Sequence, residues 1–280
     1  MIDPNSKLSI FHDDNGTFSD YTEQAADFMR DEFTAELSAT EDYLYIGFYK
    51  PISGVYIQFK TPNTNANEFS FEVYDGTSWV AADLTDESLG FTRSGFLFWD
   101  RALLNAVEVD SVEKYWVRLR PSADHSATEY RAINIVFSDD TLLKQEFYEI
   151  DNNQILPPNE TSHISSHVSV RNRIIQKLRN SGYDKYRGGD PLQPRKKKID
   201  QWDLLDIFEF RQAATYMALE KIFFNIADGP DDAWWQKYLE YKMLGEEQFA
   251  LALASIDQDD DGEEDTDEVQ QVKRSTRLVY

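Results

Sequence analysis

The sequence predicts an α+β protein, with an N-terminal antiparallel β-sandwich followed by a C-terminal α-helical bundle and an extended C-terminal tail. Four observations lead to this fold class. Short runs of alternating apolar side chains fill residues 1–150, and a polar segment over 151–170 indicates a linker. Apolar residues at helical spacing then occupy 171–256, and residues 257–280 form an acidic spacer and a basic tail.

Composition sets limits on function. The 280 residues include 51 acidic and 28 basic side chains, which gives a net charge of −23. This balance excludes a general nucleic-acid binder, because such a protein displaces phosphate counterions with clustered Lys and Arg. The chain has no cysteine, which excludes disulfides, thiolate metal sites and cysteine nucleophiles. Without a leader-like start or a long apolar run, we expect a soluble, non-secreted protein with no membrane partner.

The N-terminal runs predict roughly seven or eight strands in an antiparallel sandwich. Turn clusters such as Asp75-Gly76 and Ser94-Gly95 separate them. We expect Trp79, Trp99 and Trp116 to lie in the core or to cover a sheet. The alternating residues are Leu44, Ile46, Phe48, Val55, Ile57, Phe59, Phe69, Phe71, Val73, Phe96, Phe98, Val117, Leu119, Ile133, Ile135 and Phe137.

The C-terminal half changes to a helical period. A short amphipathic helix is predicted from Val170 to Leu178, and a long helix from about Asp200 to Ile226. Asp231, with Asp232 behind it, is the predicted N-cap of a second long helix, which would pack antiparallel against the first. So many large aromatic residues in a small helical domain would leave apolar surface exposed, which predicts contacts with other copies or partners.

No catalytic motif emerges, so we predict a non-enzymatic protein. The segment after Arg187, Gly188-Gly189-Asp190, lacks the spacing of a phosphate-binding loop. His163 and His167 are four residues apart in the polar linker, and we interpret them as a solvated pair rather than metal ligands.

The acidic spacer matches the spacing of an EF-hand calcium loop, with oxygen donors and a glycine at the required positions. Glu264 stands where such loops usually carry an aliphatic residue, and nine acidic residues in twelve are also typical of a solvated spacer. We favour the spacer and keep calcium as the alternative; no other cofactor is predicted. The loop residues are Asp257, Asp259, Asp261, Gly262, Glu263, Asp265 and Glu268.

Two basic segments are candidate docking sites. The first, at 195–198, is interpreted as a loop that docks onto an acidic surface, with a nucleic-acid patch as the alternative. The second follows the acidic spacer and is suited to docking on a sheet edge or groove of a partner, with a disordered end as the alternative. The residues are Arg195, Lys196, Lys197 and Lys198, and then Lys273, Arg274, Arg277, Leu278, Val279 and Tyr280.

Scattered aromatic and turn residues carry a resemblance to structural proteins of tailed bacteriophages. The first half resembles a β-sandwich module of such proteins, and the second half resembles head-to-tail connector proteins, the adaptors of the neck. The first set is Tyr74-Asp75-Gly76-Thr77-Ser78-Trp79, Asp83, Thr85, Gly90-Phe91-Thr92, Ser94-Gly95 and Tyr115-Trp116-Val117-Arg118-Leu119-Arg120. The second is Ile199-Asp200-Gln201-Trp202-Asp203-Leu204-Leu205-Asp206, Ala213-Ala214, Phe223-Phe224-Asn225, the helix through Tyr238 and Tyr241, and the Asp-rich segment.

The resemblance implies a virion protein of the neck, assembled in the host cytoplasm. Adaptors of this kind form a homo-oligomeric ring, usually of about twelve copies, beneath the portal protein. They extend the channel through which genomic DNA passes, and they present a surface to the next neck or tail protein. Their C-terminal tail commonly inserts into the portal, which would give Lys273 to Tyr280 that role.

Two alternatives to the neck role stay open. One is another tail or baseplate structural protein built on the same sandwich. The other is a carbohydrate-binding or hydrolytic sandwich with a helical anchor, which predicts that Trp79, Trp99 or Trp116 is exposed beside carboxylates.

Overall fold

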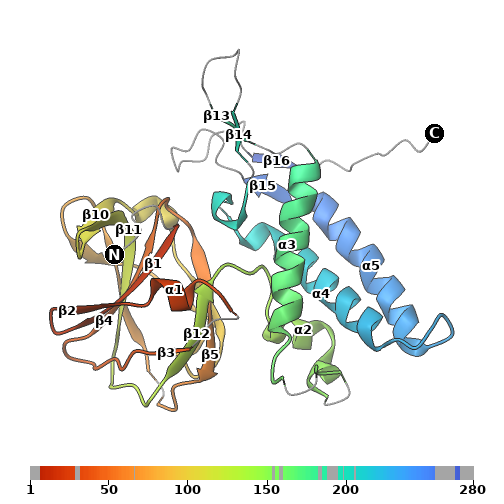
Figure 1. Cartoon of the computed structure of the whole chain (residues 1–280), viewed down its shortest axis with the longest axis horizontal. Coiled ribbons are helices and arrows are strands. Elements are labelled where there is room, and N and C mark those ends of the chain that lie inside the picture. Colours follow the sequence, from red (N-terminus) through yellow and green to blue (C-terminus); the bar gives the residue numbers. More distant parts are fainter. Residues whose placement is uncertain are drawn as a thin grey trace. The chain divides into compact units, whose positions relative to one another are not determined.

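The computed structural model describes residues 7–28, 32–65, 67–152, 155–157, 160–181, 185–187, 195–197, 199–204, 206–255 and 269–271. The chain divides into two compact units, residues 1–135 and 136–280 (Figure 1). Antiparallel strands build the first unit, and helices dominate the second. The α+β class, with sheets before helices, is therefore confirmed.

The strand unit contains antiparallel sheets in a sandwich-like arrangement. One sheet has the order β2-β1-β4-β11-β6-β7, with β10 also paired to β11, and another has the order β3-β12-β5-β9-β8. The bounds are β1 Leu8–Asp14, β2 Thr17–Asp20, β3 Phe33–Thr34, β4 Tyr43–Phe48, β5 Gly54–Thr61, β6 Phe69–Tyr74, β7 Trp79–Ala81, β8 Thr85–Asp86, β9 Gly95–Phe98, β10 Ala106–Val109, β11 Val112–Pro121 and β12 Glu129–Asn134, with helices α1 Thr22–Ala25 and η1 Arg101–Leu103.

The register of β1, β4, β11 and β6 separates the two faces of their sheet. Ile10 faces Ile46, Ile46 faces Val117, and Val117 faces Val73. Facing side chains of antiparallel strands lie on the same side of a sheet, and all four of these are fully buried. They form an apolar row of the core, as the alternating pattern predicts.

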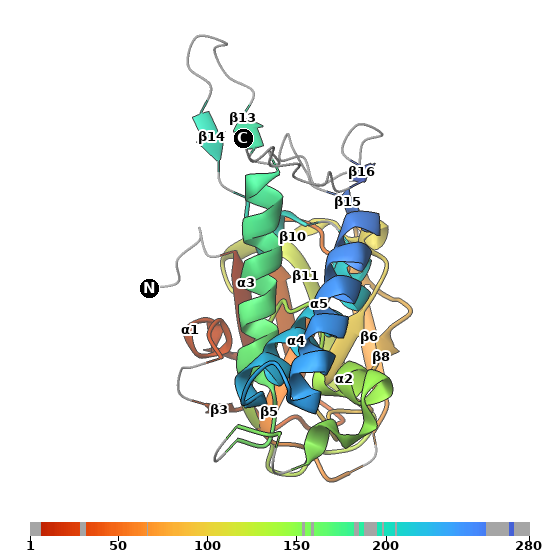
Figure 2. The same ribbon diagram turned by 90° about the vertical axis from the view of Figure 1, so that its right-hand side faces the viewer.

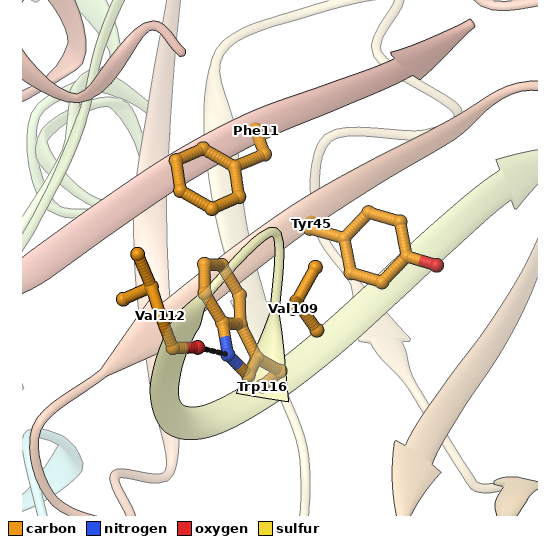
Figure 3. Close-up of a cluster of buried hydrophobic side chains, with 5 residues drawn as sticks. All are labelled: Phe11, Tyr45, Val109, Val112 and Trp116. Atoms are coloured by element: carbon orange, nitrogen blue, oxygen red, sulfur yellow. Dashed lines mark hydrogen bonds between the residues drawn. The ribbon is translucent and has the colours of Figure 1, made fainter. Parts of the chain in front are cut away.

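The opposite face of the same sheet carries an aromatic layer (Figure 3). Trp116 faces Gly47 across the β4–β11 pair, and its indole ring occupies the space that a side chain at Gly47 would need. The ring centroid of Phe11 lies 5.0 Å from that of Trp116, and Tyr45 meets the indole edge-on at 6.2 Å. The indole Nε1 donates a hydrogen bond to the Val112 carbonyl at 3.2 Å.

The tryptophan prediction is confirmed by this packing. Trp116 and Trp99 are buried, and Trp79 is half-buried over the aromatic layer. The β1–β2 hairpin was not predicted, although its Asn15-Gly16 turn places both residues at positive φ (49° and 88°), as a two-residue hairpin turn requires.

The helical unit begins before the predicted linker. Asp139 caps α2 by accepting a hydrogen bond from the Leu142 backbone N–H at 2.9 Å, and α3 already starts at Ile164. Residues 140–150, which the sequence placed with the strands, and residues 164–170, which it placed in the linker, are therefore largely helical. The bounds are α2 Asp140–Glu146, η2 Tyr148–Asp151, α3 Ile164–Asn180, β13 Lys185–Arg187, β14 Arg195–Lys197, η3 Gln201–Asp203, η4 Phe208–Phe210, α4 Arg211–Ile226, α5 Ala233–Leu251, β15 Leu253–Ser255 and β16 Val269–Gln271.

The prediction of one long helix from Asp200 to Ile226 is wrong, because α4 begins only at Arg211. The Asp200 carboxylate accepts a hydrogen bond from the backbone of Trp202 at 3.0 Å, and Asp206 accepts one from the backbone of Phe208 at 2.8 Å. Such side chain–backbone bonds close short turns that compete with an α-helix. They explain why the 3₁₀ helices η3 and η4 precede α4.

Helices α4 and α5 pack antiparallel, side by side in Figure 2. Phe223 of α4 stacks on Trp234 with ring centroids 5.5 Å apart and on Tyr241 at 5.6 Å. Phe210, just before α4, meets Phe249 near the end of α5 at 6.0 Å. Asp232 caps α5 by accepting a hydrogen bond from the Trp234 backbone N–H at 3.2 Å, close to the predicted start.

We predict that Gly47→Ala destabilises the sheet unit by about 1–3 kcal/mol. The new Cβ would lie 2.5 Å from the Trp116 ring, so the indole must leave its site. Hydrogen exchange of the β4 and β11 amides should accelerate in this variant. Gly229→Ala is the control, because no atom lies within 4 Å of its added Cβ. Equal exchange in the two variants would contradict the role given to the indole.

Candidate functional site

An apolar stripe lies on one side of α5. Trp235, Leu239 and Met243 follow at intervals of four residues, which places them on one face of the helix. Met243 is 70% exposed and Leu239 40%, and Trp235 is half-buried. Phe224, at the end of α4 and 52% exposed, contacts Trp235 with ring centroids 6.3 Å apart. We call these four residues the α5 outer stripe.

The opposite side of α5 is already packed. Trp234 and Tyr241 stack on Phe223, and burial raises the pKa of Tyr241 to about 12. Gly245 lies against Met217 of α4, so closely that an added Cβ would be 3.0 Å from the Met217 side chain. A helix that is apolar on both sides is typical of one covered on both sides. The outer stripe therefore has the character of an interface.

Charged residues join α3 to the α4–α5 pair. Arg173 binds Glu220 at 2.5 Å and Glu246 at 3.1 Å, and Lys177 also pairs with Glu246. A hollow of about 300 Å³ lies beside these ion pairs and includes Phe224 of the outer stripe. Its other lining residues are Ser169, Val170, Arg173, Glu220, Lys221 and Tyr238. The outer stripe therefore borders a hollow that charged side chains partly line.

The histidine pair of the predicted linker is buried, so its interpretation as a solvated pair is wrong. His163 and His167 are each 1% exposed. His167 Nδ1 lies 2.8 Å from the Ser138 hydroxyl, and its Nε2 lies 3.1 Å from the Asp140 carboxylate. Asp140 also accepts a hydrogen bond from the His163 backbone N–H at 3.0 Å. These contacts tie the start of α2 to the start of α3.

The serine, histidine and aspartate of this network have the residue types of a hydrolytic triad, but they do not offer a reactive surface. Ser138 is 1% exposed, so its hydroxyl does not reach a substrate from solvent. Asp140 keeps its charge because hydrogen bonds from His167 and from backbone outweigh the effect of burial, and its pKa is lowered to about 2. These hydrogen bonds have a structural role, because they join the start of α2 to the start of α3.

The aromatic layer of the sheet unit is occupied by an arginine. The Arg118 guanidinium lies 4.3 Å from the Tyr43 ring centroid and 4.4 Å from that of Trp79, and it binds Glu72 at 2.6 Å. Hydrogen bonds to Tyr45 and Glu72 raise its pKa despite burial. A sugar ring that stacks on the face of Trp79 that Arg118 covers would have to displace this cation. Because Trp99 and Trp116 are buried, neither is exposed as the carbohydrate alternative predicts.

The predicted site residues are not brought together by the described part of the chain. Arg195, Lys196 and Lys197 form β14, which pairs antiparallel with β13, so they belong to a hairpin rather than a loop. Lys198 lies outside the described residues. So do the predicted calcium residues Asp257, Asp259, Asp261, Glu263, Asp265 and Glu268 and the predicted tail residues Lys273, Arg274, Arg277, Leu278, Val279 and Tyr280. Their roles stay predictions.

The outer stripe was not predicted as a site, although the second long helix, which carries three of its four residues, was predicted. The four-residue spacing of Trp235, Leu239 and Met243 indicates an apolar face of the helix. The sequence does not show whether this face contacts α4, because that depends on the stacking of Trp234 on Phe223.

Comparison with protein-family models, with curated proteins and with solved structures finds no match. Within the described ranges, no group of three or more acidic or histidine side chains is arranged to hold a metal ion. Among the helices described, none has the length and apolar character needed to span a membrane.

We predict that the hydrogen bonds of the Asp140 carboxylate with His163 and His167 stabilise the helical unit above about pH 4. Its pKa falls from 3.8 to about 2 on folding, so the contribution is present above the unfolded pKa and is lost between about pH 4 and 2. Because the side chain is 31% exposed, we expect about 1–2 kcal/mol. Asp140→Asn should lower the free energy of unfolding by this amount at pH 7, measured by urea denaturation and helical circular dichroism.

The control is Asp151→Asn, which removes only a solvent-exposed ion pair with Lys144 and should have little effect. A deficit of Asp140→Asn that is as large at pH 2 as at pH 7 would contradict the assignment, as would no deficit at pH 7.

Proposed function

We propose that this chain is a non-enzymatic structural protein of a tailed-bacteriophage virion, a head-to-tail connector that forms a ring beneath the portal. In this proposal α3, α4 and α5 are the bundle from which a ring of about twelve copies is built. The ring extends the DNA channel and joins the capsid to the next neck or tail protein. Residues 257–268 act as a spacer, and residues 273–280 dock on the portal.

The α5 outer stripe is the observation that carries this proposal. Leu239 and Met243 expose apolar surface on a helix whose other side is filled by Trp234 and Tyr241. An apolar patch of this kind on a stable protein marks an interaction site. In a ring, the stripe of one copy would meet a different surface of the next copy, because contacts in a closed ring are heterologous.

The charge of the chain supports a channel role. A net charge of −23 repels the phosphate backbone, so DNA would pass through the ring without binding to it. Specific recognition of DNA bases is not part of the proposal, since that requires clustered basic residues.

The stripe predicts the behaviour of a double variant, Leu239→Lys with Met243→Lys. Two charges on an interface that excludes water should prevent assembly, whereas the folded helices should tolerate lysine at exposed positions. Light scattering with size-exclusion chromatography should show a monomer, and the unchanged chain should form the oligomer, alone or on portal protein. Circular dichroism would establish that the variant is folded.

Leu103→Lys is the matched control, because Leu103 is 45% exposed in the strand unit. It should assemble like the unchanged chain. Assembly of the double variant at the mass of the unchanged protein would contradict the role of the stripe.

The docking role of the tail predicts the effect of deleting residues 272–280. This deletion keeps β16 and its pairing with β15, so the fold should be retained. The shortened chain should keep its secondary structure and its self-association, but its affinity for portal protein in pull-down and light-scattering assays should fall at least tenfold. Unchanged portal binding would exclude a docking role for these residues.

A further inference from the structure

An acidic hollow of about 400 Å³ lies in the strand unit, away from the aromatic layer. His12 reaches it from the core face of β1, where it faces Leu44 of β4, and Leu37 supplies an apolar wall. None of the described residues that line it is a lysine or an arginine. Its five carboxylates are those of Asp14, Glu36, Glu41, Asp42 and Asp124.

Two of these carboxylates hold the backbone of residues 38 and 39 at the edge of the hollow. Asp42 accepts a hydrogen bond from the Ser38 backbone N–H at 2.8 Å, and Asp124 accepts one from Ala39 at 2.9 Å. Asp42 is only 7% exposed, so its charge is largely withdrawn from water. A buried carboxylate is costly unless a cation or further donors accompany it.

Two histidines in the same hollow have ring nitrogens without a hydrogen-bond partner. His12 is 8% exposed, and its Nε2 is buried and unbonded, 4.0 Å from the Asp42 carboxylate. Both ring nitrogens of His125 are likewise buried and unbonded. Burial lowers the pKa of His125 to about 4, so this ring is neutral at pH 7 and offers a lone pair. Buried polar atoms of this kind are normally satisfied, which points to a ligand.

We propose that this hollow binds a guanidinium group, the side chain of an arginine or a small molecule that carries the same group. A guanidinium has five N–H donors in a plane, which suits several carboxylates and ring nitrogens spread around one cavity. A metal ion needs ligands that converge on one point, and the described residues contain no such set. An ammonium group has three donors on a single atom and reaches fewer of these acceptors.

The alkyl stem of an arginine would rest on Leu37, while its head contacts Asp42 and His12. One source of such a group is the basic β13–β14 hairpin of a second copy, which includes Arg187 and Arg195. The other is a separate small guanidinium ligand. This inference does not depend on the connector role.

The test is calorimetric titration of the full chain with acetyl-arginine amide, with acetyl-lysine amide and zinc chloride as comparison probes. The arginine probe should bind saturably and at least tenfold more tightly than the lysine probe. Asp42→Asn should weaken it at least tenfold, since the amide oxygen still accepts the Ser38 bond but the charge is gone. Asp124→Asn keeps the hydrogen bond from Ala39 and should weaken binding of the arginine probe several-fold. This variant replaces Asp42→Asn as the test if Asp42→Asn does not fold.

The matched control is Asp110→Asn, an exposed aspartate outside the hollow at a positive φ that asparagine tolerates. It should bind like the unchanged chain. Equal affinity for both amino-acid probes would overturn the proposal, as would an equal loss of affinity in the Asp110 and Asp42 variants. Zinc that binds through Asp42 in place of the arginine probe would also overturn it. If no probe bound saturably, the hollow would hold only water and the proposal would be wrong.

A labelled peptide of residues 185–198 distinguishes the two sources. Binding at least tenfold tighter than acetyl-arginine amide, and lost in Asp42→Asn, would assign the site to the hairpin of a second copy. Weaker binding than the small probe would assign it to a small guanidinium ligand. A peptide with Lys in place of Arg187 and Arg195 that binds as well as the original would overturn the guanidinium assignment.

Discussion

The stack of Phe223 on Trp234 and Tyr241 determines which surface the helical unit presents. Trp234 and Tyr241 are seven residues apart, so both point to the same side of α5 and are held against α4. Leu239 and Met243 are each two residues from Tyr241, about 200° around the helix, and therefore face away from α4. The exposed apolar stripe is a direct consequence of this aromatic contact.

The strand unit follows a different plan, in which one sheet packs apolar side chains on both faces. Ile46 and Val117 fill the core side, while Trp116 closes over Gly47 on the other. Glycine at position 47 makes this possible, since any side chain there would occupy the place of the indole. Arg118 completes the aromatic layer, with its guanidinium over the rings of Tyr43 and Trp79.

Much of the fold follows from local sequence patterns. The alternating runs predict β4, β5, β6, β9 and β11, and the predicted N-cap Asp231 lies one residue before Asp232, which caps α5. The β1–β2 hairpin could also have been predicted, because Asn15-Gly16 is a strong turn signal. The polar and acidic composition of the first sixteen residues obscured this signal. The predicted start of α4 at Asp200 is too early for a local reason. The side chains of Asp200 and Asp206 accept hydrogen bonds from the backbone and close short turns instead of extending the helix.

The candidate sites were beyond local patterns because distant segments create them. His167 is buried against Ser138, which precedes α2, and Asp140, the first residue of α2, and a four-residue spacing in a polar segment does not reveal those partners. His12 and His125 come from opposite ends of the strand unit, and only the register of β1 on β4 places His12 at the acidic rim. The stripe of α5 likewise required the contact side of the helix to be known.

We propose that the outer stripe is covered when the chain assembles as a ring under a portal. Negative-stain imaging with light scattering, on the full chain mixed with the portal protein of the same virus, tests it most directly. We expect a closed ring of about twelve copies seated on the portal. A monomer that leaves the portal unbound at high protein concentration would contradict it.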